Sequence, residues 1–224
     1  MNSKLKKEIL SRLKLEDPFL NYKGNSSEEM HGWRNKIAEF QHAFSLLSDT
    51  KVMLEIGSWY GQSACQISKI LEKDFPDSVL LCIDTFLGGT SHWIDPELKP
   101  YLKLQHGMPT FYHSFLNNVI NQGSPEHVVP LCVTSTVAAT ILKESEVTLD
   151  FLFVDGSHLA EDVCSDLWNY VPLMNENGII MMDDWDWGTV RDGYKQYCDR
   201  DSAQASKTEL IFETDYHSLL RVTK

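Results

Sequence analysis

Apolar residues along this chain gather into short continuous runs, which alternate with stretches where they recur at helical spacing. A continuous apolar run of about four to eight residues is typical of a strand buried on both faces. We expect strands at residues 51–56, 78–84, 127–132, 151–155, 178–184, 209–214 and 218–223. Apolar spacing and helix-start signals predict helices at residues 1–20, 28–48, 62–73, 110–121, 135–143, 163–171 and 188–200.

Strands that alternate with helices predict an α/β fold with a Rossmann-like, doubly wound and mostly parallel sheet. The last two strands flank a turn at residues 215–217 and predict an antiparallel hairpin at one edge. We expect an N-terminal helical extension, residues 1–48, followed by a single larger domain, residues 49–224.

Residues 85–109 form a long connection for a compact α/β unit, and such connections are usually lids or binding loops. Asp95 followed by Pro96 predicts that a short helix begins there, with the aspartate as its cap. Trp93 of this stretch, with Trp185 and Trp187 near the fifth predicted strand, could line a substrate pocket. Tryptophan is often a core residue, so core packing is the alternative for each.

Acidic residues outnumber basic ones by 32 to 20, and the formal net charge is −12. This balance disfavours nucleic-acid and anionic-membrane partners, because both are bound through clustered Lys and Arg side chains. The five cysteines are scattered without a CxxC pair, which favours a reducing, cytoplasmic location. We therefore expect a small-molecule partner, with a homo-oligomer left open.

A tight glycine turn follows the first predicted strand, in the sequence Glu55-Ile56-Gly57-Ser58-Trp59-Tyr60-Gly61. A strand that turns into a helix places backbone N–H groups over the strand end, which is a suitable cradle for a nucleotide. Trp59 stands where a dinucleotide fingerprint needs its second glycine, and its side chain would obstruct a pyrophosphate. Glu55 favours a ligand that carries positive charge.

Acidic residues end three further predicted strands, namely Asp84, Asp155 and the pair Asp183-Asp184. The carboxyl ends of parallel strands meet at the ligand-binding edge of an open sheet, so these side chains should converge there. Asp84 is placed to accept hydrogen bonds from a ribose. The other three would crowd a small volume, where a hard divalent cation such as Mg²⁺ would relieve their repulsion. Capping of the following helices, without a metal, is the alternative.

The motifs E-I-G-S-x-x-G, C-I-D, F-V-D-G-S-H and I-I-M-M-D-D-W, in this order, resemble those of class I S-adenosylmethionine-dependent methyltransferases. The resemblance covers roughly residues 50–224. It implies a methionine-binding turn and a ribose-binding Asp84. The turn residues concerned are Glu55, Gly57, Ser58 and Gly61. Ser135 falls where the family often contacts adenine, although a plain helix cap is an equal alternative.

The paired acids and the D-G-x-H motif are similar to the metal-dependent O-methyltransferases, distantly to the catechol type and more closely to the macrocin and cephalosporin-biosynthesis type. The resemblance implies that Asp155, Asp183 and Asp184 hold a divalent cation, and Mg²⁺ is expected because it takes oxygen ligands. His158 lies three residues after Asp155. With an ordinary pKa of ~6.5, it would suit a general base beside Asp155, and a solvated loop histidine without a catalytic role is the alternative.

These observations predict metal-dependent O-methylation of a small hydroxylated substrate. A metal-free N- or C-methyltransferase is the nearest alternative, and it would turn over fully in a chelator. An NAD(P)-dependent oxidoreductase and a non-catalytic nucleoside-binding protein are the alternatives from other classes. Binding of NAD(P) would favour the first, and donor binding without transfer would favour the second.

Overall fold

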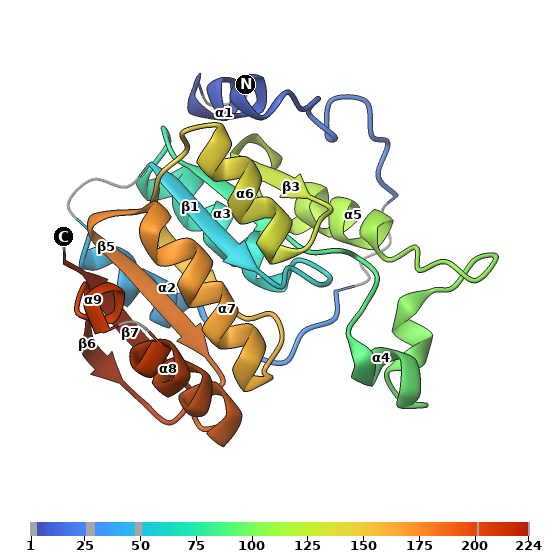
Figure 1. Cartoon of the computed structure of the whole chain (residues 1–224). Helices are drawn as coiled ribbons and strands as arrows, with labels where there is room; N and C mark the ends of the chain where they lie inside the picture. Colours follow the sequence, from blue (N-terminus) through green and yellow to red (C-terminus); the bar gives the residue numbers. More distant parts are fainter. Residues whose placement is uncertain (1–3, 26–29, 48–50, 201, 224) are drawn as a thin grey trace.

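The computed structural model describes residues 4–25, 30–47, 51–200 and 202–223, and it has a seven-stranded sheet between two layers of helices (Figure 1). The strands are β1 (Val52–Ile56), β2 (Val79–Ile83), β3 (Val128–Leu131), β4 (Leu149–Val154), β5 (Met174–Asp183), β6 (Thr208–Glu213) and β7 (His217–Val222). The helices are α1 (Lys4–Leu13), α2 (Ile37–Ser45), α3 (Gln62–Asp74), α4 (Thr90–Ile94), α5 (Tyr112–Gln122), α6 (Ser135–Glu144), α7 (Ala160–Tyr170), α8 (Gly188–Arg200) and α9 (Ser202–Ala205). Short 3₁₀ helices occupy η1 (Lys99–Leu102), η2 (Pro125–His127) and η3 (Val171–Leu173).

The strand order is β3-β2-β1-β4-β5-β7-β6, with β1 to β5 parallel and β7 antiparallel to both of its neighbours. This confirms the predicted fold class, including the closing hairpin. The chain reverses its direction of growth between β1 and β4. Ligands of open α/β sheets bind at such a switch point, beyond the carboxyl ends of the strands.

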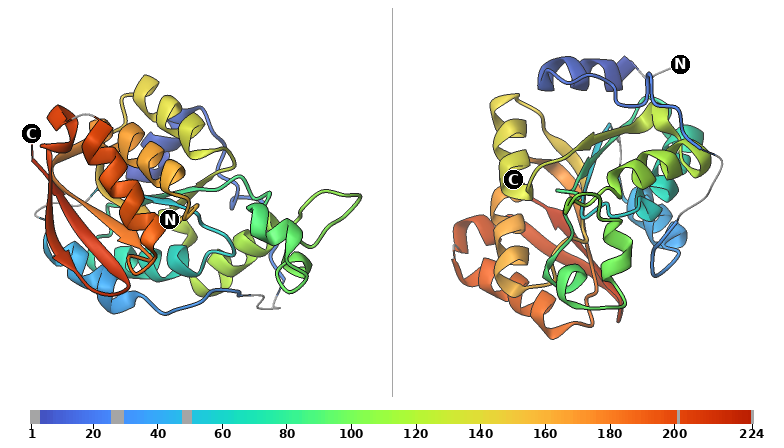
Figure 2. Two further views of the ribbon diagram at one scale, coloured as in Figure 1. Left: turned by 60° about the horizontal axis from the view of Figure 1, so that its bottom comes forward. Right: turned by 90° about the vertical axis from the view of Figure 1, so that its right-hand side faces the viewer.

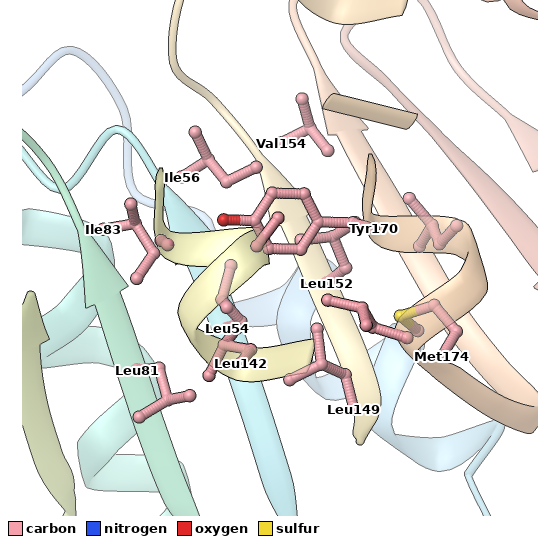
Figure 3. Close-up of a cluster of buried hydrophobic side chains, with 14 of the residues drawn as sticks. Leu54, Ile56, Leu81, Ile83, Leu142, Leu149, Leu152, Val154, Tyr170 and Met174 are labelled. Carbon is pink, nitrogen blue, oxygen red and sulfur yellow. The ribbon is translucent and has the colours of Figure 1, made fainter. Parts of the chain in front are cut away.

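Both faces of the sheet are buried, which explains why the parallel strands are continuously apolar. Leu54 and Ile56 of β1 belong to the core beneath α6, α7 and α8, part of which Figure 3 shows. Met53, which precedes Leu54 and so points to the opposite face of the sheet, belongs to the core beneath α2, α3 and α5. Burial of the two faces stabilises the sheet through the hydrophobic effect.

The first helix packs at the amino ends of the strands, away from that edge (Figure 1). Lys6 Nζ donates to the carbonyl of Pro125, just before β3, at 2.7 Å. Leu10 of the same helix enters the core on the α6–α8 side. Helix α2 packs on the opposite face, against α3. The predicted domain boundary between residues 48 and 49 lies outside the described residues.

Three predicted helices differ from the structure. The helix expected at residues 1–20 ends at Leu13, where the next residue, Lys14, takes a left-handed conformation with φ of 54°. The helix expected at residues 28–48 begins only at Ile37, where the Asn35 side chain accepts a hydrogen bond from the Ile37 N–H at 3.0 Å. The helix expected to begin at Asp95 instead ends there, with Asp95 extended at ψ 120°. The cause is Pro96, which disfavours helical geometry at the preceding residue.

None of the described helices is both long and apolar enough to cross a membrane.

Candidate functional site

The Gly57–Gly61 turn joins β1 to α3 in the left-handed backbone conformation that favours glycine, with φ of 92° at Gly57 and 85° at Gly61. A Cβ atom on Gly57 would lie 2.1 Å from the carbonyl oxygen of Asp155, and one on Gly61 would lie 2.8 Å from the Phe115 ring. The close approach that requires glycine is therefore made by the chain itself.

Two buried polar side chains at this turn have no hydrogen-bond partner among the described residues. They are Glu55, through both carboxylate oxygens, and Ser58, through its hydroxyl. Burial raises the pKa of Glu55 to about 7, although Ser58, Ser63 and Cys82 nearby oppose the shift. Unpaired buried polar groups are costly, so the turn is chemically suited to receive a ligand that carries hydrogen-bond donors.

Asp84 follows β2 and is fastened to the same turn. Its two carboxylate oxygens accept hydrogen bonds from the backbone N–H groups of Trp59, at 2.8 Å, and Phe86, at 2.7 Å. Burial raises the pKa of Asp84, and these two hydrogen bonds oppose the shift. The structure thus brings Asp84 and the glycine turn together, as the pattern of strand ends predicted.

Ser135 is the first residue of α6, but it is not the helix cap. The preceding Thr134 is the cap, and its hydroxyl accepts a hydrogen bond from the Val137 N–H at 3.3 Å. Ser135 lies close to Asp166 of α7, where it opposes the rise that burial causes in the pKa of that carboxyl. The plain capping alternative for Ser135 was therefore wrong, and its contact with adenine stays a prediction.

Asp155, His158 and Asp184 come together beyond β4 and β5, and each offers a ligand atom within 4.8 Å of the others. His158 Nε2 lies 2.7 Å from Asp184 Oδ2 and 3.8 Å from Asp155 Oδ1. Asp184 has a positive φ of 49°, a conformation that aspartate tolerates better than most residues. This left-handed residue turns the Asp184 carboxylate toward His158.

Asp183, the third expected ligand, meets two cations from the segment before α2. Lys36 Nζ lies 2.8 Å from Asp155 Oδ2 and also donates to Asp183 Oδ2. Arg34 lies 3.4 Å from the other Asp183 oxygen. The sequence reasoning missed both residues, because they fell inside a predicted helix and form no motif with the strand ends.

The two carboxylates beside His158 change its protonation. Burial lowers the pKa of His158, but hydrogen bonding and charge from Asp155 and Asp184 outweigh it and raise the pKa to about 9. His158 therefore carries a proton near neutral pH. A general base at His158 was predicted from an ordinary histidine pKa, which His158 does not have in this arrangement.

The tryptophans divide into core and surface. Trp185 is buried, and its Nε1 donates to Glu213 at 2.9 Å. Trp187 is 50% exposed, with its ring 4.8 Å from that of His158. Trp59 packs on His92, which belongs to α4, at 4.1 Å between ring centroids. Core packing therefore describes Trp185, while Trp187 faces the mouth of the cluster.

The lobe formed by residues 85–109 projects from the body of the molecule (Figure 2). It is anchored to the glycine turn, because the Tyr60 hydroxyl donates to the carbonyl of Tyr101 at 2.6 Å. The His31 ring, from the segment before α2, packs 3.8 Å from the Tyr101 ring. The lobe and that segment therefore meet beside the turn.

Comparisons with known proteins agree with this geometry. The family described as Methyltransferase domain matches residues 54–185. No curated protein matches the chain. Similar solved structures include the O-methyltransferase NovP (19% identity, 84% of this chain and 80% of that one, TM-score 0.61). Another is the O-methyltransferase TomG from Streptomyces achromogenes, in complex with SAM (15% identity, 98% of this chain and 89% of that one, TM-score 0.62). A third is an O-methyltransferase from Bacillus cereus in complex with SAH (11% identity, 98% of this chain and 90% of that one, TM-score 0.55). At these identities the likenesses show the fold.

Proposed function

The chain belongs to the methyltransferase domain family, and from this premise we propose that it transfers a methyl group from S-adenosylmethionine to an oxygen of a small hydroxylated acceptor. We propose further that the reaction needs a divalent cation. The observation that carries the proposal is the grouping of Asp155, His158 and Asp184 within 4.8 Å, at the edge where the glycine turn also ends. The similar structures described as O-methyltransferases support the choice of oxygen.

The donor is supported by the polar groups of the turn. Glu55 and Ser58 are buried without partners among the described residues, so a ligand ammonium or amide could satisfy them. The Asp84 carboxylate, held by two backbone N–H groups, keeps lone pairs for the hydroxyls of a ribose. Gly57 and Gly61 would contribute to donor binding through the left-handed backbone conformation that shapes the turn. Ser135, at the start of α6, would contact the adenine side.

The metal is supported by the donor set, because carboxylate oxygens are the ligands that Mg²⁺ prefers. Asp155, Asp183 and Asp184 would hold it, with Mg²⁺ as the expected ion. When bound, such a cation neutralises the carboxylates and lowers the pKa of an acceptor hydroxyl. With the cation neutralising these carboxylates, the pKa of His158 would fall, so that His158, oriented by Asp155 and Asp184, would take the acceptor proton. The acceptor oxygen then attacks the methyl carbon, the carbon–sulfur bond breaks, and its electron pair stays on the sulfur.

The acceptor is proposed to enter beside Trp187, whose exposed ring offers a flat apolar surface next to His158. The lobe of residues 85–109 would form the opposite wall. Exposed apolar side chains of that lobe, Leu87, Ile94 and Met108, are available for contact with a ring-shaped acceptor.

The first test is methyl transfer from labelled S-adenosylmethionine to a panel of catechols and sugars, with and without EDTA. We expect EDTA to abolish transfer and excess Mg²⁺ to restore it. Asp184→Asn should lower transfer at least about tenfold, in line with the loss of a metal ligand. Asp186→Asn, two residues away, is the matched control and should stay active. Full turnover in EDTA would instead support a metal-free methyltransferase.

A further inference from the structure

We propose that Lys36 is an internal counter-cation of the metal site, so that a divalent cation binds Asp155 and Asp183 only after the Lys36 ammonium leaves them. The inference rests on the proposed function, because it takes these carboxylates as metal ligands. It adds a competitor supplied by the chain itself, from a segment well before β1 in the sequence.

The ammonium lies between the two carboxylates rather than beside one of them. Its distance to Asp155 Oδ2 is 2.8 Å, and it donates to Asp183 Oδ2 as well. The exposed fractions of the three side chains are 12% for Lys36, 19% for Asp155 and 5% for Asp183. A divalent cation bound to the same two oxygens would lie next to the ammonium, at a position with little solvent to screen the two charges. Repulsion between the two cations therefore makes their binding mutually exclusive.

The backbone around Lys36 is held independently of its ammonium. Its N–H donates to the Gln66 side chain at 2.9 Å. Arg34 pairs with Glu39 at 3.1 Å and lies over the Tyr216 ring at 4.7 Å. His31 accepts from Trp59 Nε1 at 3.0 Å. We name residues 31–36 the strap, because these contacts fasten it across the carboxyl edge.

Exchange of the two cations at the shared oxygens consequently needs the lysine side chain to move, while Arg34 stays on the other oxygen of Asp183. A four-carbon stem rotates easily, and the ammonium is strongly attracted to water at the mouth of the site. The strap stays in place through Arg34 and His31. A site whose oxygens are already occupied binds a metal more weakly, in proportion to the fraction of molecules in which the oxygens are free.

The test is a titration with Mn²⁺ of the full chain without donor or acceptor, followed by the decrease of the free Mn²⁺ signal in electron paramagnetic resonance. Lys36→Met should bind Mn²⁺ at least about tenfold more tightly than the wild type, since a competing buried ion pair is removed. Lys36→Arg keeps the charge and should not bind more tightly. Lys73→Met, which removes an exposed lysine of α3, controls for net charge and should resemble the wild type.

A second measurement uses the wild type, so it does not depend on how well a variant folds. Acylation of Lys36 by an amine-reactive reagent, followed by mass spectrometry, should increase when Mg²⁺ is added. Acylation of Lys73 should not change. A constant reactivity of Lys36 at Mg²⁺ concentrations that saturate the site would overturn the inference.

The outcomes separate this inference from the proposed function. Equal or weaker Mn²⁺ binding by Lys36→Met, with clear binding by the wild type, would overturn the role of Lys36 and leave the metal site standing. An equal gain in Lys73→Met would also overturn it, because the effect would then come from net charge. Binding by neither the wild type nor Lys36→Met would overturn the metal site itself, and the inference with it.

Discussion

Glu55 is fully buried, and both of its carboxylate oxygens lack a partner among the described residues. Its pKa is raised from 4.5 to about 7, so the folded protein holds the proton more tightly than the unfolded chain. The stability that this group contributes is therefore complete below pH 4.5 and is lost as the pH rises to about 7. The loss amounts to about 3 kcal/mol for a shift of this size.

Glu55→Gln should remove this pH dependence, because glutamine does not ionise. Relative to the wild type, its free energy of unfolding should rise by about 3 kcal/mol between pH 4.5 and pH 8. Urea unfolding at both pH values measures it. Glu209→Gln, at an exposed position of β6, is the control and should show little pH-dependent difference. If the difference in free energy of unfolding between Glu55→Gln and the wild type were the same at both pH values, the Glu55 carboxyl would ionise in the folded protein as it does in the unfolded chain.

His158 lies 2.7 Å from one carboxylate and 3.8 Å from another, so its substitution should affect chemistry more than donor binding. We expect His158→Gln to lower kcat by about 100-fold, the scale of general acid–base catalysis. The Kd for S-adenosylmethionine, measured by calorimetry, should change less than about twofold, because the donor is proposed to bind at Glu55, Ser58 and Asp84. An unchanged kcat would exclude His158 from the proton transfer.

At the scale of elements, the strands were predictable and some helix ends were not. Burial on both faces makes β1, β2 and β4 continuously apolar, so their positions were visible in the sequence alone. The start of α2 was hidden, because residues 30–36 are held by tertiary ion pairs and by the Asn35 side chain rather than by a local pattern. Tertiary contacts of this kind leave no periodic signal.

The glycine turn gives a prediction that separates packing from backbone strain. Gly57 and Gly107 both have positive φ, of 92° and 83°. A Cβ on Gly57 would meet the Asp155 carbonyl at 2.1 Å, whereas one on Gly107 would meet nothing within 4 Å. Gly107→Ala should cost about 1–2 kcal/mol, the price of a left-handed non-glycine residue.

Gly57→Ala should cost at least about 2 kcal/mol more than Gly107→Ala, because a backbone clash adds to the same conformational strain. Thermal unfolding of both variants measures the difference. If Gly57→Ala accumulates only in insoluble form while Gly107→Ala is soluble, the order of the two effects is still established. Equal melting temperatures would show that β4 can move away from the turn at little cost.

At the scale of the molecule, the sequence indicated which edge of the sheet carries the site but not all of its contributors. The acids at the strand ends follow from topology, since parallel strands present their carboxyl ends together. Arg34 and Lys36 reach Asp183 from about 150 residues away, with separations of 149 and 147. No local sequence pattern predicts such contacts. From the sequence, a metal ion was the only positive charge expected beside these acids, whereas the structure also places the Arg34 and Lys36 side chains there.

The two parts of the N-terminal region consequently serve opposite edges: α1 covers the amino ends, and the strap crosses the carboxyl ends. Leu10→Ala in α1 should therefore lower stability by about 2–5 kcal/mol, the usual cost of a buried leucine, without changing the KM for donor or acceptor. Leu10 is 7% exposed, whereas Leu20 is 75% exposed, so Leu20→Ala is a matched control that should leave the melting temperature nearly unchanged. Differential scanning fluorimetry and initial rates, taken well below the melting temperature, measure the two properties separately. A changed KM in folded Leu10→Ala would show that the two edges of the sheet are coupled, contrary to the separation seen in their contacts.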